Sequence, residues 1–187
     1  MSQDFEKLTV YGKSFSGLTP DKEALLAEAG EKIKPHLNAV TDEFYLLLQS
    51  IPETAEFLDG RVDSLKKTHS LWIESLFTGP FDKDFTARMF KVGDVHVKVK
   101  LPVEFMAGAM TLINNRLFSL IIETFGDDKQ HCADVLTAVN AVTGFSLLVM
   151  QQSYQESSLA EELEKFLKIS GMSRTLFTNL ALAYKDK

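Results

Sequence analysis

The sequence predicts an all-α fold, and three observations support this prediction. Apolar residues recur every three or four positions along most of the 187 residues, which is the period of an amphipathic helix. No segment shows the sustained alternation of apolar and polar residues that is typical of a strand. Proline and glycine stand between the periodic segments, where helices begin and end.

The first two expected helices are bounded by glycine and proline. A short extra helix occupies the first dozen or so residues and ends near Gly12. The next helix starts at Thr19-Pro20-Asp21, because Thr19 can cap its first turn and Pro20 fits the first helical position. Pro35 then forces a break.

Four more helical segments are expected before residue 100. They are interrupted by Pro52, Gly60 and Gly79-Pro80, and they cover residues 35–50, 53–58, 61–77 and 82–99.

Two long helices follow, over residues 102–125 and 128–156. Both are apolar around much of their circumference, and a helix that is apolar on two faces must bury both. One face serves the core of the domain, and the other indicates a second copy of the chain. We therefore expect a homodimer that forms through these two helices.

The C-terminal residues 157–187 read as an amphipathic helical extension of a main domain that covers residues 1–156. Ser158-Leu159-Ala160-Glu161 has the pattern of a capping box, which predicts a new helix start, and Gly171 interrupts the apolar pattern after it. One or two further helices are expected in this extension.

Composition excludes several classes of function. The formal net charge of −6 argues against a nucleic-acid partner, because an acidic surface repels phosphate. Cys132 is the single cysteine, so no internal disulfide forms, which suits a reducing cytoplasm. The N-terminus lacks the pattern of a signal peptide, and polar residues interrupt every apolar run. We expect a cytoplasmic protein without a membrane span.

His96 is the most informative of the 4 histidines. It lies on an apolar helical stripe beside Val92, Val95 and Val99, where an unpartnered imidazole costs free energy. One interpretation is a core histidine bonded to a backbone carbonyl. The other is an axial ligand of haem iron, with its second ring nitrogen bonded to a carbonyl near Val92. No repeated Glu-x-x-His pairs of a di-iron bundle and no His-Glu-x-x-His zinc motif are present.

The surroundings of His96 resemble one family. The segment VGDVHVKVKLP, residues 92–102, is similar to the proximal region of globin-coupled sensors and protoglobins. Asp42-Glu43-Phe44-Tyr45, the turn at 52–58, and Leu65-Lys66 followed by Trp72 also fit this family, in the same order along residues 18–155. The resemblance implies a globin fold, haem b (iron protoporphyrin IX) as cofactor, and His96 as the ligand of its iron.

The resemblance also implies a set of residues around the haem. Tyr45 is the expected distal hydrogen-bond donor, although its hydroxyl could instead lie in water. Leu65 is expected over the haem as an apolar gate, with Phe44 as a wall of the pocket. Met89 and Val92 complete the contacts, although core packing explains Met89 and Phe44 at least as well.

The role of His69 and the backbone conformation of Lys100 need separate predictions. His69 lies one helical turn beyond Leu65, so it is either a sixth ligand of the iron or a histidine at the edge of the core. Lys100 stands where many members of the family have a glycine, which permits a positive φ at this corner. We expect Lys100 to adopt an extended conformation instead.

The function that the resemblance implies is reversible binding of O2, CO or NO, with the signal passed through the dimer. Residues 1–187 hold no output domain, so the chain either signals through a separate partner or is the sensor part of a longer protein. Three alternatives remain open: a haem-free regulatory module, a haem enzyme that oxidises nitric oxide or acts as a weak peroxidase, and a plain helical scaffold. Since no reductase or flavin motif is present, a non-enzymatic role is expected.

Overall fold

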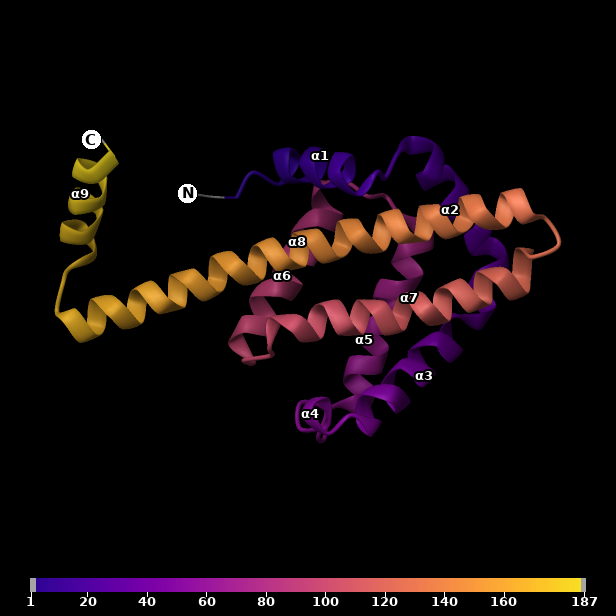
Figure 1. Cartoon of the computed structure of the whole chain (residues 1–187), viewed down its shortest axis with the longest axis horizontal. Coiled ribbons are helices and arrows are strands. Elements are labelled where there is room, and N and C mark those ends of the chain that lie inside the picture. The colour runs from indigo at the N-terminus through magenta and orange to yellow at the C-terminus, as the bar shows by residue number, and fades with distance from the viewer. Residues whose placement is uncertain (1–2, 186–187) are drawn as a thin grey trace.

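The computed structural model describes residues 3–185, and the all-α prediction is confirmed because no strand occurs among them. The helices follow one another along the chain without long loops (Figure 1). In chain order they are α1 (Phe5–Ser16), α2 (Pro20–Ile33), the short 3₁₀ helix η1 (Lys34–His36), α3 (Leu37–Ser50), α4 (Pro52–Ala55), α5 (Val62–Thr78), α6 (Lys83–Lys98), α7 (Val103–Phe125), α8 (Lys129–Ser170) and α9 (Arg174–Lys185).

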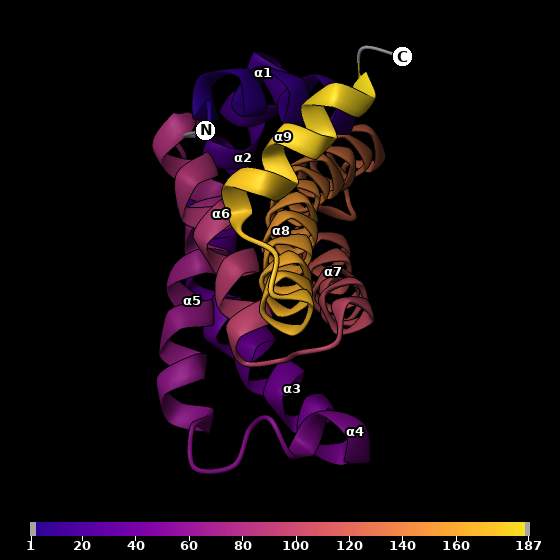
Figure 2. The ribbon, with the colours of Figure 1, turned by 90° about the vertical axis from the view of Figure 1, so that its left-hand side faces the viewer.

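Helix α8 forms the centre of the molecule. It packs against α6, α7, α1 and α2. Figure 2 shows α5 and α6 on one side of the bundle and α7 and α8 on the other. The residues of α8 that face the core are completely buried, among them Val135, Val139, Val142, Phe145 and Val149. The core therefore lies where α8 crosses the helices of the N-terminal half.

Most predicted helix boundaries are confirmed. Thr19 accepts a hydrogen bond from the backbone of Lys22, and Pro20 occupies the first turn of α2. Pro35 lies in η1, which separates α2 from α3 as its ring requires. Asp82 and Asp128 cap α6 and α8 by accepting hydrogen bonds from backbone N–H groups of the first turn.

The predicted end of the first helix at Gly12 is wrong. Helix α1 continues to Ser16, and Gly17 ends it with a φ of 69°. Gly12 lies inside the helix because it is the point of closest approach to α8. A Cβ atom at this position would lie 2.7 Å from Cε2 of Phe145.

The predicted helix start at Ser158 is also wrong. Helix α8 runs without interruption to Ser170, and Gly171 ends it with a φ of 69°. No glycine or proline stands between Gly144 and Gly171, and good helix formers follow Ser158, so the local capping pattern does not stop the helix. The last part of α8 extends past the other helices and leads to α9 (Figure 1).

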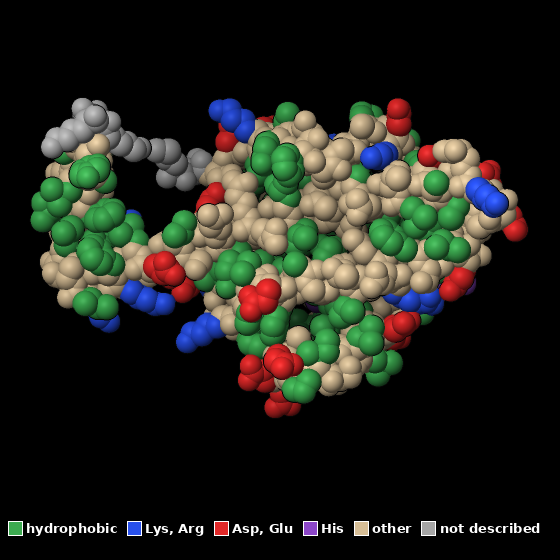
Figure 3. Space-filling view, viewed as in Figure 1, with side chains coloured by type: hydrophobic (Ala, Val, Ile, Leu, Met, Phe, Trp, Pro, Cys, Tyr) green, Lys and Arg blue, Asp and Glu red, His purple; other side chains and the backbone are tan. Residues whose placement is uncertain are grey.

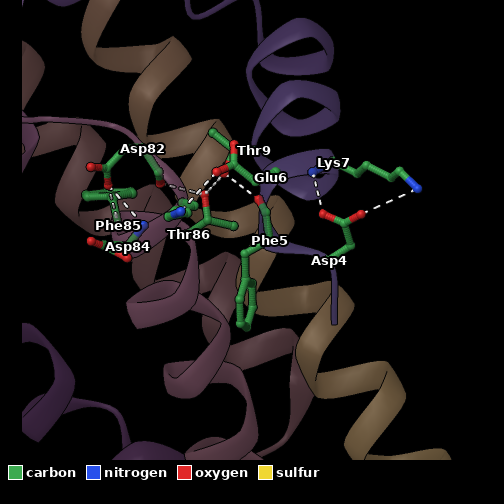
Figure 4. A network of polar contacts seen from close by, with 10 residues as sticks. Asp4, Phe5, Glu6, Lys7, Thr9, Asp82, Asp84, Phe85 and Thr86 are labelled. Carbon is green, nitrogen blue, oxygen red and sulfur yellow. Dashed lines mark hydrogen bonds and ion pairs between the residues drawn. The ribbon is translucent and has the colours of Figure 1, made fainter. Parts of the chain in front are cut away.

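Polar and aromatic contacts hold helix α1 against α6 (Figure 4). The hydroxyl groups of Thr9 and Thr86 lie 2.6 Å apart, in hydrogen-bond contact and buried. Lys83 forms an ion pair with Glu6 at 3.1 Å, and the ring of Phe5 packs edge-on against Phe90. These contacts place the extra N-terminal helix on the helix that carries His96.

Helices α7 and α8 are long and apolar enough in composition to cross a membrane, a property that core helices of water-soluble proteins share. In the most apolar stretch of α7 only 33% of the residues are buried, against 56% in α8. Exposed hydrophobic side chains such as Val103 and Ile122 remain on α7. Hydrophobic side chains also gather on α9 (Figure 3). The single chain thus leaves apolar surface on α7 and on the C-terminal extension.

Candidate functional site

His96 lies in the last turn of α6 and is half-buried. Its Nδ1 atom is buried and has no hydrogen-bond partner among the described residues. The predicted bond from this ring to a carbonyl near Val92 is therefore absent. Burial lowers the pKa of His96, so the ring is kept neutral and able to act as a ligand.

A glycine brings the helix of His96 very close to α8. A Cβ atom on Gly93 would lie 2.2 Å from the backbone oxygen of Met150 and 2.8 Å from Cβ of Ser153. Only glycine permits such an approach of two helix backbones. The hydroxyl of Ser153 donates a hydrogen bond to the backbone oxygen of Phe90, six residues before His96 on α6.

Two further contacts hold the end of α6 on α8. Ser157 donates a hydrogen bond of 3.1 Å to the Asp94 carboxylate, which also pairs with Lys98 at 2.6 Å. The hydroxyl of Tyr154 donates to the backbone oxygen of Leu101 at 3.0 Å, just past the helix end. The position of His96 is thus determined by α8.

The predicted extended conformation of Lys100 is wrong. Lys100 has a φ of 57° and is the single non-glycine residue with positive φ among residues 3–185. The N–H of Lys100 donates to Val97 and that of Leu101 donates to His96, each at 2.9 Å. These two bonds satisfy the last carbonyls of α6, which explains why a lysine adopts the conformation that favours glycine.

Tyr45 of α3, the expected distal residue, is completely buried. Its hydroxyl forms a hydrogen bond with Nδ1 of His69 on α5, so the alternative of a hydroxyl in water is wrong. Burial raises the pKa of Tyr45, which remains a neutral phenol. Burial, and to a smaller extent the nearby His96, lower the pKa of His69 to about 4.

An aromatic cluster surrounds the bond between Tyr45 and His69. The rings of Phe44 and Trp72 lie with their centroids 5.6 Å and 6.2 Å from that of His69, both edge-on. The Nε1 atom of Trp72 is buried and finds no hydrogen-bond partner in the described part of the chain. Helical spacing alone favours a core position for Trp72, but its place on the same stripe as Leu65 and His69 is the signal for a position in the site.

Two polar contacts fix α5 against α3 next to this pair. Lys66 binds Asp42 at 2.9 Å, and the Ser70 hydroxyl donates to that of Thr41 at 3.2 Å. They lie on either side of His69 in the sequence. The neighbouring turns of α3 and α5 are therefore held in one register.

The remaining predicted site residues divide into two groups. Phe44 and Met89 are buried in the core, while Leu65 and Val92 are only half-buried at its edge. Helix α5 packs on α2 and α3, and α6 packs on α8 and α1, whereas α5 and α6 have no extensive contact with each other. Leu65 on α5 and Val92 on α6 thus lie at the edge of the core, and His96 is half-buried on the same helix as Val92. In Figure 3 the surface is hollowed below α7.

Comparison with known proteins identifies the fold and the family. A model of the Protoglobin family matches residues 6–159. The globin domain of a globin-coupled sensor from Geobacter sulfurreducens superposes with a TM-score of 0.72 and 31% identity, over 77% of this chain and 95% of that domain. The ferric globin domain of E. coli DosC superposes with a TM-score of 0.65 and 20% identity, over 78% of this chain and 99% of that one, and shows the same fold.

One relative of known role is similar in sequence. The heme-based aerotactic transducer HemAT of Halobacterium salinarum is 25% identical over 118 residues, which is 62% of this chain. The chain spans only 23% of the length of that protein. The predicted globin fold is confirmed, and the chain belongs to the protoglobin family, with the globin domains of globin-coupled sensors among its structural relatives.

Proposed function

We propose that this chain is a haem-based sensor globin that reversibly binds O2 or another diatomic gas, CO or NO. The observation that carries the proposal is the half-buried His96 imidazole at the end of α6, whose Nδ1 is buried and has no hydrogen-bond partner within residues 3–185. Membership of the protoglobin family and the similarity to a heme-based transducer support it.

The residues present fit haem b better than a metal held by protein ligands alone. Among residues 3–185 no three His, Cys, Asp or Glu side chains gather to bind a metal ion. A metal at His96 would therefore need a carrier with its own ligands, such as a porphyrin. Apolar side chains of Leu65, Met89 and Val92, together with Phe44, would contact the porphyrin, and His96 would bind its iron.

When bound, ferrous haem supplies an iron atom that takes a diatomic gas reversibly. Tyr45 and His69 would provide the polar groups that meet the bound gas. The neutral phenol of Tyr45 can donate a hydrogen bond to a gas that gains negative charge, which favours O2 over CO. His69 forms a hydrogen bond with Tyr45 through Nδ1, so only its Nε2 atom could act as a sixth ligand of the iron.

The contact between α6 and α8 is a route for the signal. Because Gly93 places the two backbones in contact, a displacement of α6 along its axis must move α8 or break this packing. The apolar surface of α7 that a single chain leaves uncovered, with Val103 and Ile122 exposed, supports a homodimer through residues 102–125 and 128–156. Displacement of α8 would then alter the dimer.

We further propose that the main domain and the C-terminal extension have different roles. Residues 1–156 act as the sensor, and residues 157–187 pass the signal to a separate partner or to a further part of the protein. The proposed role is non-enzymatic and cytoplasmic, with no membrane or nucleic-acid partner.

The test is an absorption spectrum after addition of haem to the purified chain. The wild type should gain a Soret band, and His96→Ala should lose it or bind haem much more weakly. His36→Ala, which removes an exposed histidine of η1, serves as the control and should behave as the wild type. A folded wild type without a haem spectrum would refute the proposal.

A further inference from the structure

The hydrogen bond between Tyr45 and His69 has a consequence for ligand binding. A phenol hydroxyl carries one hydrogen and can donate one hydrogen bond at a time. In this structure the partner of the Tyr45 hydroxyl is Nδ1 of His69. The same hydrogen is the one that Tyr45 would donate to a gas.

The chemistry of the two groups decides which of them donates. A phenol is a stronger donor than a neutral imidazole N–H, and an unprotonated imidazole nitrogen is a stronger acceptor than a phenol oxygen. His69 is kept neutral by its burial and by the neighbouring His96. The favoured arrangement is therefore the Tyr45 O–H donating to Nδ1 of His69, with the imidazole hydrogen on Nε2.

The surrounding contacts maintain this pair. The Lys66–Asp42 ion pair and the Ser70–Thr41 hydrogen bond connect α5 to α3 on both sides of His69. Phe44 and Trp72 pack edge-on against the His69 ring. Because Tyr45 is completely buried, water does not offer its hydroxyl another partner.

We propose that His69 is a positioning residue that holds the hydroxyl hydrogen of Tyr45 in the gas-free protein and competes with the gas for it. This inference rests on the proposed function. A gas that accepts the hydrogen bond gains only the difference between the new bond and the one that His69 gives up. His69 therefore lowers the affinity for O2 relative to CO, which gains little from a donor.

The first test measures O2 and CO dissociation rates of the haem-loaded protein. His69→Leu should slow O2 release by roughly threefold to tenfold, the range expected from one hydrogen bond, and leave CO release nearly unchanged. In a Tyr45→Phe background the same substitution should have no effect on the O2 rate, since no hydroxyl is left to release. His69→Asn keeps an acceptor oxygen near the place of Nδ1 and should retain an O2 rate close to that of the wild type.

His36→Leu is the matched control, because it makes the same change at an exposed histidine. The proposal is overturned if His69→Leu changes the O2 rate equally with and without the Tyr45 hydroxyl. It is also overturned if His69→Leu alters the absorption spectrum of the gas-free ferrous protein alike in both backgrounds, because His69 would then act on the iron.

The second test uses the haem-free chain, so it separates failure of this inference from failure of haem binding. Melting temperatures are measured for His69→Leu, Tyr45→Phe and the double variant. If the two residues are bonded, their effects are non-additive, and the double variant melts close to the less stable single variant. Strictly additive effects would show that the pair does not form and would refute the inference independently of haem.

Discussion

The helix that carries His96 and the helix that carries His69 are held in place by different kinds of contact. On the His96 side, α6 meets α8 backbone to backbone at Gly93, and side chains of α8 bind backbone oxygens at Phe90 and Leu101. On the His69 side, α5 is joined to α3 by side chains that bind other side chains.

This difference indicates different roles for the two sides. Backbone contacts have no alternative rotamers, so a shift of α6 must be passed on to α8. Bonds between side chains can exchange partners without moving a helix. In the proposed sensor, the His96 side is therefore suited to transmit a displacement, and the His69 side is suited to respond to a bound gas.

The largest effect is expected where the two backbones touch. Gly93→Ala places a Cβ atom 2.2 Å from the Met150 oxygen, and neither helix can yield without losing its other contacts. We expect a loss of about 3 kcal/mol or more in unfolding free energy, measured by denaturant unfolding.

Gly108→Ala provides the control for this substitution. Gly108 lies inside α7 with no heavy atom within 4 Å of the added Cβ. Because alanine favours a helix interior, this variant should be more stable by about 0.5–1 kcal/mol. A Gly93→Ala variant as stable as the wild type would contradict the close contact of α6 and α8.

The second effect concerns the His69 side and depends on pH. The unfolded chain protonates a histidine below pH 6.5, whereas folded His69 protonates only near pH 4. Since the unfolded state then binds more protons, stability falls as the pH is lowered from 6.5 to 4. The loss from His69 is about 2–3 kcal/mol in the haem-free protein.

His69→Leu tests this assignment by unfolding at pH 7 and pH 4.5. The variant should lose clearly less stability between these two values than the wild type does. His96, whose pKa is also lowered by burial, contributes in the same direction and leaves some pH dependence in the variant. If the unfolding free energies of wild type and variant depended on pH in the same way, the loss of stability would arise from groups other than His69.

The order of the helices was predictable because periodicity and proline or glycine boundaries act locally. Thr19-Pro20 and Pro35 are examples, since their effect depends on a few neighbouring residues. The end of α1 and the length of α8 were not predictable in this way. Gly12 is a contact to Phe145, far away in the sequence, and the capping pattern at Ser158 competes with a helix that is already formed.

The candidate site was predictable in part for the same reason. The position of His96 on an apolar stripe is a local property of α6. The bond between Tyr45 and His69 joins two helices and depends on how α3 and α5 are aligned, which no spacing in the sequence reveals. The conformation of Lys100 likewise depends on the hydrogen bonds that end α6, so a rule based on residue type alone failed.

A third prediction concerns the corner after His96. Tyr154→Phe removes the hydroxyl that binds the Leu101 oxygen and leaves the ring in place. We expect a loss of about 1 kcal/mol in unfolding free energy, the usual contribution of one partly buried hydrogen bond. Ser119→Ala, which removes an exposed hydroxyl bonded only to the Asn115 oxygen of its own helix, is the control and should change stability less. Equal losses would indicate that α8 does not hold this corner.

The smallest effect is expected at Lys100 itself, because two terms oppose each other. Glycine removes the cost of a Cβ atom at positive φ, about 1 kcal/mol, but it also gives the unfolded chain more freedom. Lys100→Gly should therefore raise the unfolding free energy by only about 0.5 kcal/mol, whereas Lys100→Ala, which keeps the Cβ, should not. If Lys100→Gly destabilised the protein instead, the lysine side chain itself would contribute to the corner, and the left-handed conformation would carry no net cost for the helix that bears His96.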